Sequence, residues 1–183
     1  MVVSFAIWLQ NLPLFDYIRV SSAYAVLLTL HLMFISAYAA MILATDLRLL
    51  GWGMRSHKIA DIVDQLRVPK RIGFVLVATC GVLLLGSKAE EYYYNPFVRL
   101  KFTLFALVVV HALVFRGSVY NKAAEFDKLN VVPGRAKLAA GLSLFLWISI
   151  ACMGRAIGYI SPANSPHHYA ALFQAGLETA FGR

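Results

Sequence analysis

Four long stretches of the chain are almost free of charged residues, and short charged segments separate them. A helix that crosses a bilayer needs about 20 mostly apolar residues. Each stretch reaches this length if the flanking Lys and Arg side chains extend toward the membrane surface. The pattern therefore predicts four transmembrane helices, over residues of about 17–50, 69–90, 96–122 and 135–160.

Shorter segments carry apolar residues at helical spacing between polar ones. The N-terminal segment MVVSFAIWLQNLPLF has this pattern up to Pro13, and RSHKIADIVDQLRVPKR has it after Ser56, a favourable N-cap residue. Amphipathic helices of this kind lie in the membrane interface. We therefore expect an all-α integral membrane four-helix bundle with interfacial N-terminal and loop helices. Residues 1–162 would form this domain, and residues 163–183 would form an amphipathic tail on the outer side.

The composition supports this interpretation and excludes several classes of site. The chain is 60% hydrophobic and 14% charged, with a mean hydropathy of +0.69, which does not suit a soluble domain. Cys80 and Cys152 both lie in apolar runs and form no CxxC or CxxCH motif. That spacing argues against a disulfide framework, a structural zinc site and covalent attachment of haem.

Basic residues gather in the segments 48–71 and 116–137. These are Arg48, Arg55, Lys58, Arg67, Lys70, Arg71, Arg116, Lys122, Lys128, Arg135 and Lys137. Because loops rich in Lys and Arg face the cytoplasm, we expect both termini to be periplasmic. The net charge of +8 is then a topology signal, and no basic and aromatic interleaving suggests nucleic acid.

Two histidines lie inside predicted spans, where an unpaired polar side chain is costly. His31 shares a helix face with Tyr24 and Tyr38, and His111 lies on an apolar stripe of the third span. Two facing histidines in a helix bundle suggest haem b with two axial imidazoles. Depth estimates leave the pairing open, because different choices of helix boundary give axial offsets between the two rings of about 8 Å or about 15 Å. The larger offset would forbid a shared iron.

Basic residues in the outer half suggest a second feature of the same site. Lys101 and Arg155 enter apolar helices and Arg99 stands just above them, so together they could form a cationic pocket for haem propionates or a quinone-like ligand. His31 would then be the principal ligand, with a methionine (Met33, Met41 or Met153) as a weak sixth ligand. In the simpler interpretation, Lys101 and Arg155 extend to the outer surface. Asp46 is interpreted as a structural carboxylate at a helix end.

Several segments resemble known families. LLTLHLMF, TDLRLLGWG, EEYYYNPFVRLKFTLF and LSLFLWISIACMGRAIGYI resemble an uncharacterised family of four-helix bacterial inner-membrane proteins, a domain of unknown function. More distantly, the layout is similar to the haem-binding, oxygen-independent protoporphyrinogen oxidase family and to the CopD membrane domain. In the oxidase family a histidine in the first helix and a lysine opening the third form the functional pair, and His31 and Lys101 match those places. The resemblance implies haem binding. Because the N-terminal segment and the EEYYYNPF turn do not belong to that pattern, porphyrinogen oxidation is not predicted.

These features together predict a haem b subunit of the bacterial inner membrane. The subunit would contact the lipid bilayer and other subunits of a redox complex, and it would pass electrons between a periplasmic partner and the quinone pool. It would therefore be a non-catalytic electron-transfer or anchor subunit of an oxidoreductase complex. The alternatives are a cofactor-free structural subunit and a copper or small-molecule transport module.

Overall fold

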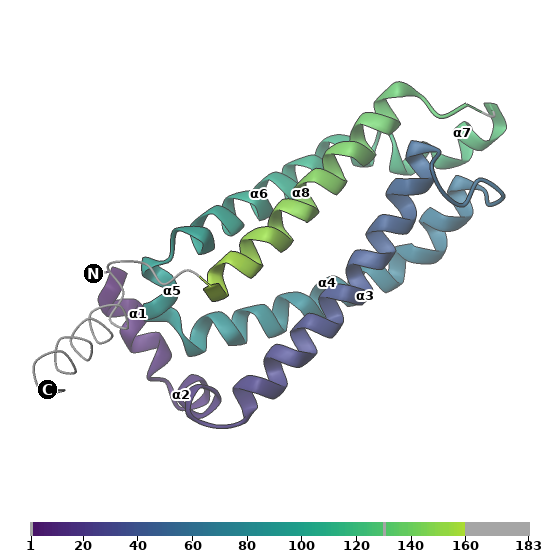
Figure 1. The fold of residues 1–183 in the computed structure, drawn as a ribbon. Helices are drawn as coiled ribbons and strands as arrows, with labels where there is room; N and C mark the ends of the chain where they lie inside the picture. The colour runs from purple at the N-terminus through teal and green to yellow at the C-terminus, as the bar shows by residue number, and fades with distance from the viewer. Residues whose placement is uncertain (1, 130, 160–183) are drawn as a thin grey trace, which may run out of the picture.

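The structure is a computed structural model that describes residues 2–129 and 131–159. Every regular element within these residues is a helix. Four of the helices dominate the molecule and run side by side (Figure 1). They are α3 (Ala23–Leu50), α4 (Ile59–Ser87), α6 (Pro96–Arg116) and α8 (Gly134–Tyr159). The predicted tail over residues 163–183 lies outside the described residues.

Each long helix belongs to a segment that is long and apolar enough to span a membrane. The segment that contains α6 continues to Lys128 and includes two short helices, η1 (Tyr120–Lys122) and most of α7 (Ala123–Leu129). Many large apolar side chains on these helices are exposed, including Val26 (58%), Val75 (60%) and Leu113 (69%). In water such surfaces would be unfavourable, and in a bilayer they contact lipid. The chain is therefore an all-α, multi-pass membrane protein, as the hydropathy pattern predicts.

The long helices pack in the spatial order α4, α3, α8, α6. Helix α3 packs against α4 on one side and α8 on the other, and α8 also packs against α6. Helices α4 and α6 make at most marginal contact, so the α3/α4 and α6/α8 pairs diverge in Figure 1. The two central helices, α3 and α8, therefore have neighbours on both sides.

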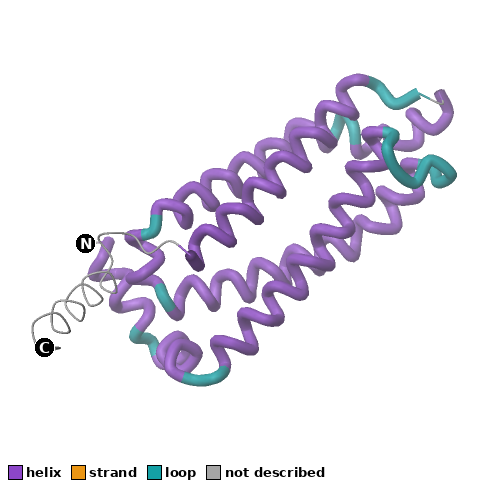
Figure 2. Tube along the Cα trace, in the orientation of Figure 1, coloured by secondary structure: helices purple, strands orange, loops and turns teal. Residues whose placement is uncertain are grey.

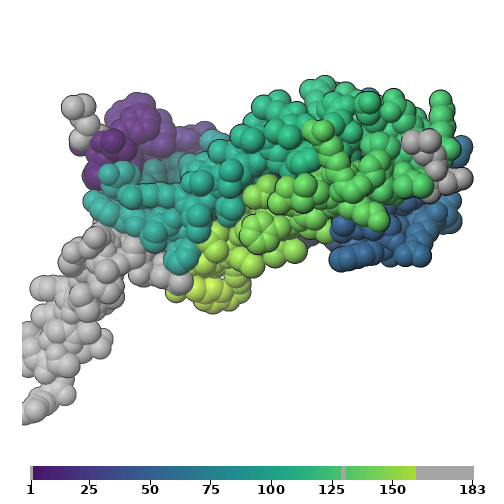
Figure 3. All heavy atoms as spheres, turned by 90° about the horizontal axis from the view of Figure 1, so that it is seen from above, coloured from purple at the N-terminus to yellow at the C-terminus, as the bar shows by residue number. Residues whose placement is uncertain are grey.

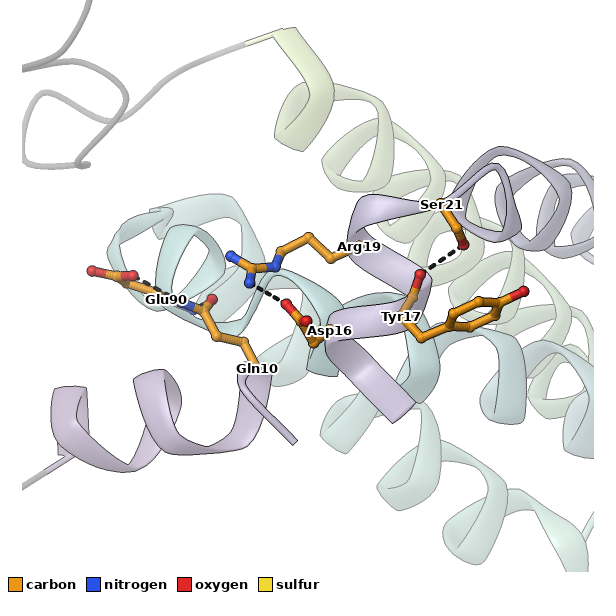
Figure 4. A network of polar contacts seen from close by, with 6 residues as sticks. All are labelled: Gln10, Asp16, Tyr17, Arg19, Ser21 and Glu90. Carbon is orange, nitrogen blue, oxygen red and sulfur yellow. Dashed lines mark hydrogen bonds and ion pairs between the residues drawn. The ribbon is translucent and has the colours of Figure 1, made fainter. Parts of the chain in front are cut away.

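Short helices close one end of the bundle, which we call the cap end. They are α1 (Val2–Gln10), α2 (Pro13–Val20) and α5 (Ala89–Tyr94). The Gln10 side chain donates to a Glu90 carboxylate oxygen at 2.9 Å, and its own oxygen accepts from the Glu90 backbone N–H at 3.1 Å (Figure 4). Asp16 and Arg19 form an ion pair within α2, and Ser21 Oγ donates to the Tyr17 carbonyl as the chain leaves that helix.

The opposite end, which we call the loop end, contains the most deeply buried apolar residues. The α3–α4 connection, η1 and α7 meet the start of α8 there (Figures 2 and 3). Its core consists of Leu49, Ile59, Phe115, Val119, Ala123, Phe126, Ala136, Ala139 and Ala140. The carboxylate of Asp127 in α7 accepts from the backbone N–H groups of Ile59 at 2.8 Å and Ala60 at 2.9 Å. This side chain therefore caps α4 from a distant part of the sequence.

The structure differs from the predicted boundaries at three places. The expected loop helix after Ser56 is not separate, because α4 begins at Ile59 and continues through Pro69 to Ser87. The cap of this helix is Asp127 rather than Ser56. The first predicted span, 17–50, is interrupted at Ser21 and Ser22, where α2 ends and α3 begins; the third ends at Arg116 rather than residue 122.

Phe15 of α2 packs against α4 at a glycine, and this contact predicts a stability effect. A Cβ atom at Gly86 would lie 2.4 Å from the Phe15 ring. We expect Gly86→Ala to lower the free energy of unfolding by about 1–3 kcal/mol, because the ring must be displaced. Gly141→Ala is the control, since a Cβ there meets no atom within 4 Å. Thermal unfolding in detergent, followed by the circular dichroism signal of the helices, measures the effect. Equal melting temperatures for the two variants would contradict the close contact between Phe15 and Gly86.

The Asp127 cap gives a second prediction. Asp127→Ala should lower the free energy of unfolding by about 2 kcal/mol, because two N–H groups at the start of α4 lose their acceptor. Asp64→Ala removes an exposed carboxylate that pairs with Arg67 at 2.7 Å and should change stability by less than about 1 kcal/mol. Equal melting temperatures for the two variants would show that the cap contributes nothing.

Candidate functional site

His31 lies in α3 toward the cap end and is only 9% exposed. Its ring packs against α4 beside Gly81, where a Cβ atom would lie 3.3 Å from His31 Cε1. The Val77 carbonyl, one turn earlier in α4, accepts a hydrogen bond from the ring. Because Nδ1 has no partner among the described residues, the donor is Nε2, and Nδ1 carries a buried lone pair. The glycine therefore lets the ring approach the backbone of α4 closely.

Lys101 of α6 contributes a positive charge to the same region. Its Nζ lies 3.5 Å from the position that a Cβ would take at Gly154 in α8. The ammonium group is close enough to act electrostatically on His31, and no carboxylate within the described ranges forms an ion pair with it. The structure thus brings together His31 and Lys101, with Gly81 of α4 and Gly154 of α8 beside them. We call this group the His31–Lys101 site.

The other two predicted cations lie outside this site. Arg99 is exposed, donates to the Tyr93 carbonyl at 3.1 Å and lies over the Tyr93 ring. Arg155 is also exposed and interacts with the hydroxyl and ring of Tyr159. Of the three residues of the expected cationic pocket, only Lys101 is directed into the bundle. Arg155 extends to the surface, as the simpler interpretation has it, and Arg99 lies at the surface as well. Among the candidate sixth ligands, Met33 is 61% exposed.

His111 has a different environment from His31. Its Nε2 lies 2.9 Å from the Ala139 carbonyl oxygen of α8, and its ring lies beside Phe115. The half-buried imidazole is therefore hydrogen-bonded to the backbone of the neighbouring helix. A histidine satisfied in this way needs no ligand to account for its position in the membrane.

Ring contacts at Trp147 of α8 fix the relative depth of the two histidines. This ring contacts Tyr38 of α3 at 5.1 Å and Phe105 of α6 at 6.2 Å, so the three aromatics form one layer. His31 lies seven residues from Tyr38 toward the cap end, and His111 lies six residues from Phe105 toward the loop end. At about 1.5 Å per residue, the two rings are about 20 Å apart along the bundle. The structure does not bring them to a shared iron.

A second polar cluster, near the loop end, was not predicted as a site. Asp46 is 2% exposed, and its Oδ2 has no hydrogen-bond partner in the described part of the chain. Ser143 of α8 hydrogen-bonds to the carboxyl group, and the Lys70 ammonium of α4 interacts with it electrostatically. Lys70 also donates to the Thr45 hydroxyl. Asp46 lies about one turn before the end of α3, and its carboxyl group is buried inside the bundle.

Metal ions in proteins are commonly held by clusters of His, Cys, Asp and Glu side chains. Within residues 2–129 and 131–159, no group of three or more His, Cys, Asp and Glu side chains could hold a metal ion. Cys80 is buried and Cys152 is exposed, and both are free thiols. His57 is exposed on the α3–α4 connection.

Comparison with known proteins identifies a family but no activity. The model of a family of unknown function (DUF6644) matches residues 14–160, a range that includes all four long helices. No curated protein and no solved structure matches the chain. The resemblance to an uncharacterised four-helix membrane family is confirmed, whereas the distant similarity to the haem-binding oxidase and CopD domains stays a prediction.

The Asp46 cluster predicts charge coupling between two helices. Asp46→Ala should lower the free energy of unfolding by about 1 kcal/mol, because the half-buried Lys70 ammonium loses a carboxylate that interacts with it electrostatically. The double variant Asp46→Ala/Lys70→Met should recover part of this loss, since no buried charge is left unpaired. Thermal unfolding of the wild type, Asp46→Ala, Lys70→Met and the double variant completes a double-mutant cycle, which measures the coupling between the two residues. A double variant no more stable than Asp46→Ala would show that the two charges are not coupled.

Proposed function

We propose that this chain, which belongs to the DUF6644 family of unknown function, is a membrane subunit that binds haem b non-covalently with His31 as an axial ligand. The observation that carries the proposal is the buried Nδ1 of His31, which has no partner among the described residues. Leaving such an atom unsatisfied costs about 1–3 kcal/mol. A bound metal centre would offset that cost.

The hydrogen bond from His31 to α4 supports a ligand role. Histidines that bind metals usually donate their other ring N–H to a carbonyl or carboxylate, and this second bond fixes the tautomer and the ring orientation. The Val77 carbonyl occupies that position here. Haem takes an imidazole through Nε2, because the Cβ substituent beside Nδ1 would crowd the macrocycle. Ligation would therefore require the His31 ring to turn, so that Nε2 faces the metal and Nδ1–H donates to a backbone carbonyl.

Lys101 supports an anionic cofactor. Its ammonium group is held inside the bundle near His31, and no carboxylate among the described residues forms an ion pair with it, so a propionate could pair with it. Gly81 and Gly154 carry no side chain at the two contacts, so the His31 ring and the Lys101 ammonium group lie close to the backbones of α4 and α8. Haem would supply one-electron redox chemistry, while the protein would set the potential through ligation, low dielectric and the Lys101 charge.

The cellular role follows from this chemistry and from the charge distribution. We propose that the subunit lies in a bacterial inner membrane with the cap end on the periplasmic side, because basic residues gather in the segments near the loop end. Electrons would pass between a periplasmic redox partner and the quinone pool within a larger complex. The protein's own contribution would be to hold the cofactor and exclude water from it.

An absorption spectrum of the protein purified from membranes tests this proposal. We expect a Soret band and a sharp reduced α-band, with haem quantified as its pyridine haemochrome. His31→Ala should abolish these bands, whereas His31→Met should restore a bound haem with a shifted spectrum. His111→Ala and His57→Ala should leave the spectrum unchanged. Lys101→Met should retain the bands and lower the reduction potential, because removal of a nearby cation favours the oxidised form.

A colourless protein, or one in which His31→Ala retains the full spectrum, would contradict haem ligation at this residue. The alternative function is then a cofactor-free anchor of a membrane complex. The hydrogen bond between His111 and the Ala139 carbonyl favours that alternative, because it shows how this bundle can satisfy an imidazole with backbone alone. Metal analysis of the same sample would separate this outcome from a copper-binding module.

A further inference from the structure

A depression of about 560 Å³ lies at the loop end, well away from the His31–Lys101 site. The last turn of α3, the connection after it, the segment before α8 and the first turn of α8 form its walls. Gly51 adopts a left-handed conformation with φ of 77°, and the backbone N–H groups of Trp52 and Gly53 both donate to the Leu47 carbonyl. These bonds end α3 and hold the connection in the shape that forms one wall.

Three cationic side chains line this depression. They are Arg48, Arg55 and Lys137. Nε of Arg48 donates to the His57 carbonyl at 2.7 Å, and Nε of Arg55 donates to the Gly51 carbonyl at 2.6 Å. Each guanidinium group is therefore positioned by its Nε bond. The terminal nitrogens of Arg55 make no hydrogen bond within the described residues and remain available to a ligand.

The charge of the depression is poorly compensated by the protein. Arg48 has one carboxylate neighbour, Asp127, at 4.0 Å. That carboxylate already accepts two backbone N–H groups of α4. Within the part of the chain that the structure describes, Arg55 and Lys137 form no ion pair. An anion with several oxygen acceptors would complement this arrangement.

Apolar side chains form the rest of the lining. Trp52 is 75% exposed and Val131 is 63% exposed, and both contribute to the depression. Tryptophan is enriched at the level of lipid headgroups, where one side is apolar and the other is wet. A ligand that is anionic at one end and apolar at the other would match both parts of the lining.

We propose that this depression binds the phosphate group of an anionic phospholipid, with Arg55 and Lys137 contacting the phosphate oxygens and Trp52 contacting the glycerol and upper acyl region. The chemistry that is recognised is a phosphate, which could also come from solution. The apolar lining favours the lipid as its source. The basic segments near this end, which are expected to face the anionic cytoplasmic leaflet, place the site beside such lipids. This assignment does not depend on haem.

Binding to the detergent-purified full chain tests the proposal by native mass spectrometry and by the shift in melting temperature. The probes are phosphatidylglycerol, phosphatidylcholine and inorganic phosphate. We expect phosphatidylglycerol to bind and to raise the melting temperature, as a ligand of the folded state must. Phosphatidylcholine should bind at least tenfold more weakly. Arg55→Gln/Lys137→Gln should weaken phosphatidylglycerol binding by about tenfold or more, because each cation near the surface contributes substantially to anionic lipid affinity.

The matched control is Arg67→Gln/Lys122→Gln, which removes two cations whose charges are already paired with Asp64 and Glu125. This control should bind phosphatidylglycerol like the wild type. An equal loss in both double variants would indicate attraction to net charge alone and would overturn the site. Inorganic phosphate that binds as tightly as phosphatidylglycerol, with the same sensitivity to Arg55 and Lys137, would overturn the lipid assignment.

Discussion

Each polar side chain within an apolar bilayer must find its partner inside the protein, because lipid offers none, and this constraint shapes the bundle. Lys70 donates to a threonine of α3, and His111 lies within hydrogen-bonding distance of a carbonyl of α8. His31 bonds to a carbonyl of α4. All three bonds join two helices, so the same contacts that satisfy polar atoms also hold the helices together. Within the described residues, two buried side-chain atoms lack such a partner, Nδ1 of His31 and Oδ2 of Asp46.

The order of the helices explains where these atoms lie. Helices α3 and α8 are central, and α3 carries both His31 and Asp46. The outer helices each supply a lysine directed inward, Lys101 from α6 near the cap end and Lys70 from α4 near the loop end. The bundle therefore contains two polar sites, each with a group from α3 and a cation from a flanking helix. They differ in that the lysine near the loop end has a carboxylate counter-charge, whereas the lysine near the cap end has none among the described residues.

Hydropathy was sufficient to predict the four spans, because a bilayer requires long apolar helices whatever their tertiary contacts. It did not predict that α4 continues through Pro69, since proline normally ends a helix and only the Asp127 cap and the packing of Ile59 reveal the extension. The importance of His31 was visible in the sequence as an imidazole in an apolar run. Its relation to His111 was not, because relative depth depends on how the helices slide past one another. Asp46 was interpreted as a structural carboxylate near the end of the first helix, and it does lie about one turn before α3 ends at Leu50. Its burial beside Ser143 and Lys70 was not visible in the sequence, because it depends on how α3 packs against α8 and α4.

The central claim is that the His31 ring, one nitrogen of which is unpaired, binds a metal centre inside the bundle, and an experimental density map of the detergent-purified protein tests it most directly. The account predicts strong planar density in contact with the His31 ring, with Lys101 directed toward its edge. A well-resolved map in which protein side chains alone surround that ring, and Nδ1 bonds to one of them, would contradict it.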